Sequence, residues 1–515
     1  MSFKIQYTEK LTIELLVVLF ALGISFFPLL FNLPFRDNIY LSWEGAYRIA
    51  NGDIPFKDFY MPFGYGYFIF IALFFKLFGS GLTVLLWAQA FLNTLFLFVF
   101  YRLILLFDIK REIALISTFV MGLTYTFLFF WPWYNQTAFF FNLVALYFAC
   151  LAVLKEKRSF LHAVLAGVFA FLAFFTKQDY GGLALVFVLF LFLVNLFFGG
   201  SVKSIGTYLA SFALTAALFI LPVYNQAFSY WFNLGQAPHE SRIDISRLLT
   251  EVFAGSEWEK LVLLIVGILL IYKWKVLLKD KKKFFFYTLV LIILAETIIT
   301  KETSRLPKDT TTYFYGFFFA LFLTELFSFI DFKKLKYGLT LVCLIFFLFS
   351  SKYWSYANRI LKFKSTGTAK TTSAKPSYVW ASAPFLSFNK VYLPKPTITG
   401  IKEILALNLP SNPKVLNMSE LTMLAKEIPY EPLKKVPLWY HLHVGIFDKQ
   451  VEGLREAIEK GAFDLVLFED IPNLDNFYPY ALQTQLRKSY KLVTVFPAPR
   501  KDGNSFIEVY IKYAH

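Results

Sequence analysis

Cysteine is scarce in this sequence: the 515 residues include only Cys150 and Cys343, and both lie within apolar runs. Two isolated thiols support neither a disulfide framework nor a thiolate metal site, so both are expected to pack in apolar interiors. Glycine-rich phosphate loops of the G-x-G-x-x-G or G-x-x-x-x-G-K type are missing as well. Chemistry driven by ATP or by nucleotide sugars therefore lacks its usual binding loop.

Acidic residues are also few, since 35 Asp and Glu stand against 51 Lys and Arg and give a net charge of +16. The chain is 57% hydrophobic with a mean hydropathy of +0.55, which is typical of integral membrane proteins. Much of the basic excess lies in short loops between apolar segments, where it sets topology. The expected partner is therefore membrane lipid and not nucleic acid.

Apolar segments close to the roughly 20 residues needed to cross a bilayer predict about eleven transmembrane helices. The first is expected to be retained, because it lacks the small-residue pattern of a signal cleavage site. A further apolar run, 62–78, is expected to be embedded without crossing. The predicted spans are 11–33, 81–106, 113–131, 136–154, 160–176, 181–198, 204–222, 260–272, 284–300, 312–330 and 337–352.

The basic clusters decide the predicted topology. If 62–78 does not cross, clusters such as Lys155 to Arg158 and Lys273 to Lys283 all fall in the cytoplasm, as the positive-inside rule requires. The sequence thus predicts a multi-pass protein of the inner (cytoplasmic) membrane. Its N-terminus is expected in the cytoplasm and its C-terminal domain in the periplasm or outside the cell.

Composition changes after the last predicted span. Residues 353–377 form a linker that becomes rich in Thr and Ser, and 378–515 alternate short apolar runs with helical patterns. This order predicts an extracytoplasmic α/β domain, attached to a mainly α polytopic membrane domain, 1–352. Helices are expected near 419–427 and at 450–460 and 478–488, and strands at 415–417, 464–468, 491–496 and 506–511.

The stretch 36–79 is the most informative, because it carries four carboxylates beside a predicted membrane surface. Between 38 and 51, apolar residues recur at helical spacing while polar ones fall elsewhere, which predicts an amphipathic surface helix. The turn signal Gly-Asp-Ile-Pro follows at 52–55. The four carboxylates are Asp37, Glu44, Asp53 and Asp58.

This stretch resembles the first extracytoplasmic loop of the GT-C glycosyltransferases, which include protein O-mannosyltransferases and lipid A aminoarabinose transferases. The shared order is an Asp, a surface helix, Gly-x-x-Pro-Phe-x-Asp-Phe, Pro-x-Gly, an aromatic run and Phe-x-Leu-Phe-Gly. The resemblance implies a polyprenyl-phosphate sugar donor, no cofactor, and 1–352 as the catalytic domain. The family's catalytic acid, just after the first span, corresponds to Asp37.

Each carboxylate has a functional and a structural interpretation. Asp37 is expected to act as a general base, since transfer to a hydroxyl requires removal of the acceptor's proton; the alternative is a helix N-cap. Glu44 and Asp58 are candidates to hold the acceptor or to orient a basic residue, and solvated surface carboxylates are the alternative. Asp53, in the turn, is expected to be structural.

Lys177, Gln178 and Asp179 follow a very apolar predicted span on its outer side. A similar Lys-Gln pair occurs in the GT-C family, so the resemblance also implies a binding role. A lysine ammonium there can stabilise the anionic leaving group of a polyprenyl-phosphate donor. The alternative is a lysine that reaches to interfacial water, with Asp179 as its partner.

Arg305 is the preferred phosphate ligand of the segment 305–315, because a guanidinium binds phosphate through two parallel hydrogen bonds. Tyr313 is a candidate hydrogen-bond donor, and Lys301 and Lys308 compete with Arg305. Glu296, inside an apolar run, is costly unless it is paired or faces a cavity. Interfacial anchors are the alternative interpretation of the arginine and tyrosine.

No metal site is expected. His441 and His443 could share one side of a strand, but no third ligand is nearby. His239-Glu240 lacks the H-E-x-x-H spacing.

Together these features predict an inverting glycosyltransferase that moves a sugar from a polyprenyl-phosphate carrier to an extracytoplasmic lipid, glycan or protein acceptor. A transporter or flippase of a lipid-linked glycan is the alternative, although such a protein normally shows two matching halves with charged or broken helices. A non-catalytic scaffold in envelope assembly is the third.

Overall fold

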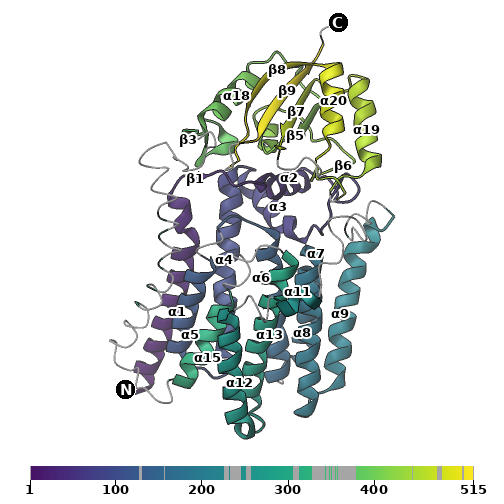
Figure 1. Ribbon diagram of the computed structural model, residues 1–515. Helices are drawn as coiled ribbons and strands as arrows, with labels where there is room; N and C mark the ends of the chain where they lie inside the picture. Colours follow the sequence, from purple (N-terminus) through teal and green to yellow (C-terminus); the bar gives the residue numbers. More distant parts are fainter. Residues whose placement is uncertain are drawn as a thin grey trace. The chain divides into compact units, whose positions relative to one another are not determined.

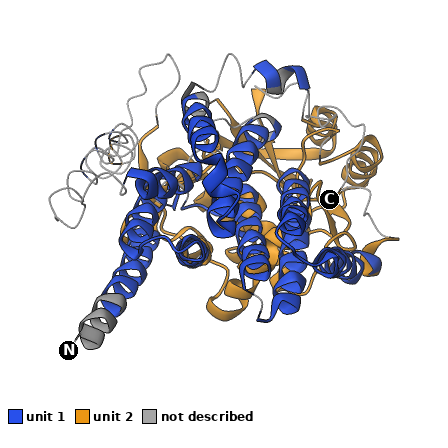
Figure 2. Cartoon of the chain, turned by 90° about the horizontal axis from the view of Figure 1, so that it is seen from below, with its two compact units in different colours: residues 1–28, 90–221, 241–353 blue, residues 29–89, 222–240, 354–515 orange. Residues whose placement is uncertain are grey.

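The computed structural model of the chain comprises two compact units (Figure 2). Unit 1 contains residues 1–28, 90–221 and 241–353, and unit 2 contains residues 29–89, 222–240 and 354–515. The span predicted at 337–352 and the linker predicted at 353–377 lie outside the described residues, apart from single positions. The described residues are 2–126, 130–155, 157–225, 231, 245–250, 257–304, 313–326, 343, 347, 350, 354, 357, 378–443, 445–472, 478–500 and 504–513.

Unit 1 is built from helices, and Figure 1 labels them in chain order. The helix α4 starts in unit 2 and continues in unit 1. The helices are α1 (Ser2–Phe26), α4 (Leu82–Leu105), α5 (Arg111–Thr124), α6 (Tyr134–Leu154), α7 (Ser159–Thr176), α8 (Gln178–Phe197), α9 (Val202–Ile220), α11 (Ile245–Thr250), α12 (Glu257–Leu277), α13 (Lys281–Ser304) and α15 (Phe314–Leu326).

Seven helical segments among the described residues are long and apolar enough to cross a membrane, which is fewer than the eleven predicted. The predicted spans 113–131 and 312–330 contain helices of only 14 and 13 residues, and charges at both ends shorten the apolar part of α12. The total of eleven therefore stays a prediction. The seven segments are Leu11–Leu30, Leu82–Leu105, Tyr134–Leu154, Ser159–Thr176, Gln178–Phe197, Val202–Val223 and Lys281–Lys301.

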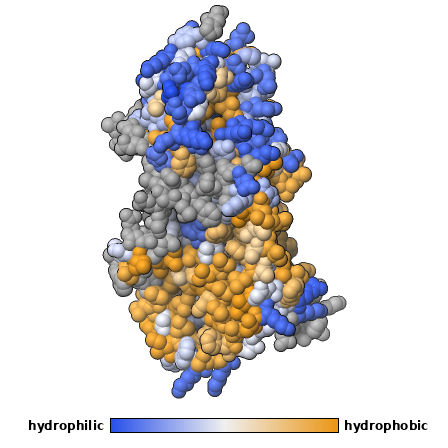
Figure 3. Space-filling view, turned by 90° about the vertical axis from the view of Figure 1, so that its right-hand side faces the viewer, coloured by the Kyte–Doolittle hydropathy of each residue, from blue (hydrophilic) through white to orange (hydrophobic). Residues whose placement is uncertain are grey.

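The surface of these helices is apolar, as expected where lipid replaces water. On α9 the side chains of Leu214 and Leu218 are each 72% exposed. Figure 3 shows apolar side chains gathered on such helices. Of the two cysteines, Cys150 is buried as predicted, whereas Cys343 is exposed and not packed in an interior.

The short helix α3 (Gly66–Phe78) corresponds to the ambiguous run 62–78. Its 13 residues extend for roughly 20 Å at the usual helical rise, which is less than the hydrocarbon thickness of about 30 Å. This length agrees with a helix that does not cross.

The C-terminal part of unit 2 has the predicted α/β character. A four-stranded sheet has the order β5-β7-β9-β8, in which β5 (Val415–Met418) is parallel to β7 (Leu465–Asp470) and the other pairs are antiparallel. Alternating apolar residues of these strands meet Ile458 and Leu482 in one core. The remaining elements are β8 (Tyr490–Pro497), β9 (Phe506–Lys512), α18 (Lys395–Leu405), α19 (Asp448–Glu459) and α20 (Tyr480–Ser489).

The helix predicted near 419–427 is wrong in type, since only a 3-10 turn, η6 (Thr422–Lys426), forms there. The Asn417 side chain accepts from the Ser419 N–H, and the Ser419 hydroxyl accepts from the Leu421 N–H. Such local side-chain hydrogen bonds compete with those of an α-helix.

Unit 2 also combines the segment 34–80, predicted to be the first outer loop and called by that name below, with the C-terminal part through short strand pairs. β1 (Leu33–Pro34) runs parallel to β4 (Val391–Pro394), which pairs with β3 (Trp380–Ser382). Similarly, β2 (Phe59–Tyr60) runs parallel to β6 (Val436–Pro437). Residues 29–89 thus belong to the same compact unit as the predicted C-terminal domain, 378–515.

The predicted amphipathic helix exists as α2 (Ile39–Ala50), but its polar side is not open. It packs against α3 and against η6. Gly45 permits the first contact, because a Cβ there would lie 2.5 Å from the Phe68 ring. Arg48, expected on a polar face, is only 1% exposed. Its charge needs partners inside the protein, which the first outer loop and the C-terminal part supply.

Candidate active site

The catalytic candidate Asp37 directly precedes α2 in unit 2. Asn38, and not Asp37, is the N-cap residue of that helix, and its backbone is left-handed with φ 64°. The Asn38 N–H donates to both carboxylate oxygens of Glu420, each at 2.9 Å. The N-terminal end of α2 is therefore bound by a side chain from 382 residues further along the chain.

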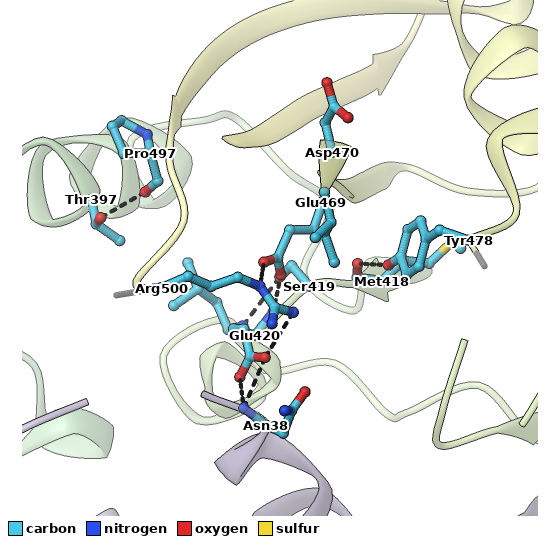
Figure 4. A network of polar contacts seen from close by, with 12 residues as sticks. Asn38, Thr397, Met418, Ser419, Glu420, Glu469, Asp470, Tyr478, Pro497 and Arg500 are labelled. Carbon is cyan, nitrogen blue, oxygen red and sulfur yellow. Dashed lines mark hydrogen bonds and ion pairs between the residues drawn. The ribbon is translucent and has the colours of Figure 1, made fainter. Parts of the chain in front are cut away.

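Glu420 belongs to a buried polar cluster with Glu469 and Arg500 (Figure 4). Arg500 Nη2 lies 2.9 Å from Glu420, and its Nε donates to Glu469. The Glu420 N–H donates to Glu469 at 2.7 Å. Glu420 and Glu469 are at most 1% exposed, so each hydrogen bond is made away from bulk water.

Asp37 lies within electrostatic reach of this cluster. Burial, opposed by Arg500 and assisted by Glu469 and Asp37, raises the pKa of Glu420 to about 8. Burial also raises the pKa of Glu469, again with a contribution from Asp37. The surroundings of Asp37 thus hold two further carboxyl groups and one guanidinium, and the two acids bind protons more readily than in water.

Sequence reasoning missed Glu420, Glu469 and Arg500. The available signal was position: Glu420 follows β5 closely and Glu469 lies near the end of β7, and these two strands are parallel neighbours. Polar residues at the carboxyl ends of parallel strands are the usual site-forming residues of α/β sheets.

Glu44 and Asp53 surround the buried Arg48. The guanidinium lies 3.4 Å from Glu44 and 3.0 Å from Asp53, and it donates to the carbonyl oxygens of Asp58 and Leu433. Burial raises the pKa of Glu44 to about 7, although Arg48 opposes the shift. Glu44 thus pairs with a buried basic residue, and its functional role stays a prediction.

Asp58 stabilises the turn that precedes it. Its carboxylate accepts from the Ile54 N–H at 2.7 Å and lies 3.7 Å from Lys434. The Ile54 hydrogen bond, assisted by Lys434, lowers the pKa of Asp58. Asp53 is also 3.7 Å from Lys434 and serves the predicted structural role.

In unit 1, Lys177 and Asp179 form an ion pair at 2.7 Å, with both side chains about 15% exposed. Asp179 also accepts from Thr303 at 2.6 Å, which ties the start of α8 to the end of α13. The Lys177 ammonium lies 5.0 Å from the centre of the Tyr180 ring. The Asp179 carboxylate and the Tyr180 ring thus hold the Lys177 ammonium in place.

The other predicted residues of unit 1 have different surroundings. Gln178 is half-buried at the first position of α8. Tyr313 is buried and stacks on Phe139 with ring centres 3.7 Å apart. Glu296 is fully buried and accepts from the Asn142 amide at 2.7 Å. Arg305 and its competitor Lys308 lie outside the described residues.

An apolar cavity of about 530 Å³ opens between α8, α12 and α13. Its lining includes Phe190, Trp274 and Ile292. The volume is large enough for several carbons of a lipid chain.

The described residues contain no group of three or more His, Cys, Asp or Glu side chains placed to hold a metal ion. His441 lies beside Trp439, and His443 has a left-handed backbone in a turn, so the two do not continue one strand. His239 and Glu240 lie outside the described residues.

No protein-family model and no curated protein matches the chain. Among solved structures, it is similar to ArnT from Cupriavidus metallidurans bound to undecaprenyl phosphate, with 14% identity, a TM-score of 0.52, and coverage of 96% of this chain and 97% of that chain. The apo form of ArnT gives 13% identity, a TM-score of 0.51, and coverage of 99% and 98%. Because both likenesses extend over nearly the whole length, this chain has the fold of ArnT, the GT-C fold that the first outer loop implied.

Proposed function

We propose that the chain is an inverting glycosyltransferase that moves one sugar from a polyprenyl-phosphate carrier to a hydroxyl of an extracytoplasmic lipid, glycan or protein. The observation that carries the proposal is the likeness to ArnT, a protein that binds undecaprenyl phosphate, over 96% of this chain. The charged residues of the first outer loop and of the α8 start supply groups suited to this chemistry.

In the proposed reaction, the acceptor oxygen attacks the anomeric carbon while the bond from that carbon to the phosphate oxygen breaks. Polyprenyl phosphate leaves with the electron pair, and one direct displacement inverts the anomeric centre. Asp37 takes the acceptor's proton as a general base.

The donor's phosphate is proposed to bind near Lys177, with Gln178 and Tyr313 as hydrogen-bond donors and Arg305 as a second cation. Lys177 is supported by its geometry, because Asp179 and Tyr180 hold the ammonium in place. A fixed positive charge stabilises the negative charge that develops on the leaving phosphate.

The apolar cavity between α8, α12 and α13 suits part of the carrier's isoprenoid tail. Glu44 and Asp58 are proposed to contribute indirectly, by holding Arg48 and Lys434 and thereby the loop that carries Asp37.

The test is transfer by purified protein from a panel of labelled polyprenyl-phosphate sugars to envelope extract. Wild-type protein should transfer at least one sugar, and Asp37→Asn should lose nearly all activity while keeping its thermal unfolding midpoint. Asp464→Asn is the matched control, because Asp464 accepts from the Lys414 N–H through an exposed hydrogen bond of unit 2. Transfer from nucleotide sugars alone would overturn the donor assignment, and an active Asp37→Asn variant would exclude Asp37 as the base. No transfer by the purified wild-type protein would favour a scaffold or a flippase.

A further inference from the structure

The N–H of Asn38 belongs to the peptide bond that joins this residue to Asp37. An acceptor of that N–H therefore holds Asp37 as well. Both oxygens of Glu420 are this acceptor, and the Asn38 side chain itself makes no capping hydrogen bond. Helix N-termini are normally capped by a side chain of the N-cap residue. At α2 the polar partner comes instead from the C-terminal part of unit 2, and it accepts from the N–H of the N-cap residue itself.

We propose that Glu420 is a positioning residue for Asp37. The inference rests on the proposed function, in which Asp37 removes a proton from the acceptor. A base must lie within hydrogen-bond reach of the proton it removes, and a displacement of about 1 Å costs on the order of 100-fold in rate. Glu420 contacts neither substrate in this proposal and acts through the backbone.

Glu420 is itself held on two sides, so it can fix its partner. Arg500 binds its carboxylate at 2.9 Å, and its own N–H donates to Glu469 at 2.7 Å. Arg500 also binds Glu469, so that the three side chains form a closed set. With Glu420 fully buried, its rotamer is restricted by packing as well as by charge.

The cluster joins three parts of the sequence at one point. Glu420 follows β5, Glu469 belongs to β7, and Arg500 lies between β8 and β9. All three come from the C-terminal part, whereas Asn38 comes from the first outer loop. The four-stranded sheet thus supplies the fixed frame from which the backbone at Asp37 is held.

The experiment compares Glu420→Ala and Glu420→Gln with the control Glu427→Ala in the full-length protein. Glu427 is also a carboxylate of unit 2, and it accepts from the N–H and the hydroxyl of Ser387 and not from α2. Sugar transfer with the donor panel gives kcat and KM, and hydrogen exchange followed by mass spectrometry reports on peptides that cover the start of α2.

We expect Glu420→Ala to lower kcat about 10- to 100-fold with little change in the donor's KM. Glu420→Gln retains an acceptor oxygen and should therefore keep most of the wild-type kcat. Exchange at the start of α2 should be faster in Glu420→Ala and unchanged in Glu427→Ala. A merely structural role would instead lower kcat equally in both alanine variants.

Two outcomes would overturn the inference: unchanged exchange at the start of α2 in Glu420→Ala, or equal losses of kcat in Glu420→Ala and Glu427→Ala. Failure of the proposed function looks different, because the wild-type protein would then transfer no sugar at all. In that case faster exchange in Glu420→Ala would still show that Glu420 holds the backbone at Asp37. The absence of sugar transfer would refute only the catalytic purpose of this contact.

Discussion

Arg48 and Leu433 lie 385 residues apart in the sequence, and the Arg48 guanidinium donates to the Leu433 carbonyl oxygen at 2.5 Å. The same guanidinium binds Glu44 and Asp53 in the first outer loop. One buried cation therefore joins the loop that carries Asp37 to the C-terminal part of the same unit.

Replacement of Arg48 by Ala should strongly destabilise unit 2. Removal of one partner of a buried ion pair leaves the remaining charge uncompensated, which costs about 3–5 kcal/mol. The unfolding midpoint of Arg48→Lys should lie between those of the wild-type protein and Arg48→Ala, because an ammonium cannot make the guanidinium's several directed hydrogen bonds. The measurement is the thermal unfolding midpoint in detergent.

Arg455 provides the control for this prediction. It pairs with Glu452 and Glu459 on the exposed side of α19. Exposed pairs contribute little to stability, so Arg455→Ala should leave the midpoint unchanged. Equal midpoints for Arg48→Ala and Arg455→Ala would show that the buried pairs of Arg48 do not stabilise the loop.

The stability of unit 2 should depend on pH through Glu44. Burial raises its pKa from the usual 4.5 to about 7, so the folded state binds more protons than the unfolded state between these values. The stabilisation is fully present below 4.5 and is lost as the pH rises through 7. The measurement is the unfolding midpoint of wild-type protein across this range.

Glu44→Gln cannot titrate and should show a weaker decline of the midpoint with rising pH. Part of the decline should remain, because burial also raises the pKa of Glu420, to about 8, and this shift changes stability with pH in the same direction. An identical decline in the wild-type protein and Glu44→Gln would contradict the assignment.

The elements that were predicted correctly depend on local patterns. In the C-terminal part, α19, α20, β7, β8 and β9 follow helical or alternating apolar periodicity and lie close to their predicted bounds. Long apolar runs likewise predicted the seven described segments that are long and apolar enough to cross a membrane. Local patterns are sufficient for α19, α20, β7 and β9 because these elements bury their own apolar residues, whereas β8 leaves Leu492, Val493 and Val495 exposed.

What the sequence did not reveal depends on contacts between distant residues. β1 and β2 have two residues each and form only because β4 and β6 pair with them. Nothing near Arg48 indicates that it is buried, since one acceptor, Leu433, is remote. Glu420 likewise becomes relevant to Asp37 only after β5 and β7 fold.

Lys177→Gln should raise the donor's KM about tenfold or more, because a charged hydrogen bond contributes about 1.5–3 kcal/mol and 1.4 kcal/mol corresponds to a factor of ten. Lys177→Arg keeps the positive charge, so its KM for the donor should remain closer to the wild-type value. The measurement is transfer rate against donor concentration. Lys203→Gln is the control, because this lysine is exposed at the start of α9. A KM that rises equally in both glutamine variants would exclude a specific contact with the donor.

Asn142 and Glu296 offer a test inside the helices of unit 1. The Asn142 amide donates to the Glu296 carboxyl group at 2.7 Å, and both side chains are fully buried. Asn142→Leu should be destabilising, because it leaves a buried carboxyl oxygen without its donor. Asn142→Leu/Glu296→Leu should cost less than the sum of the two single changes, because an apolar pair replaces both polar groups.

A double-mutant cycle on unfolding in mixed micelles measures this coupling. Hydrogen bonds between membrane helices average about 0.6 kcal/mol and reach about 1.7 kcal/mol. Because a carboxyl group is the acceptor here, we expect a value in the upper part of that range. Strict additivity of the two single changes would mean that the hydrogen bond does not stabilise the helices, and that Glu296 is retained for another purpose.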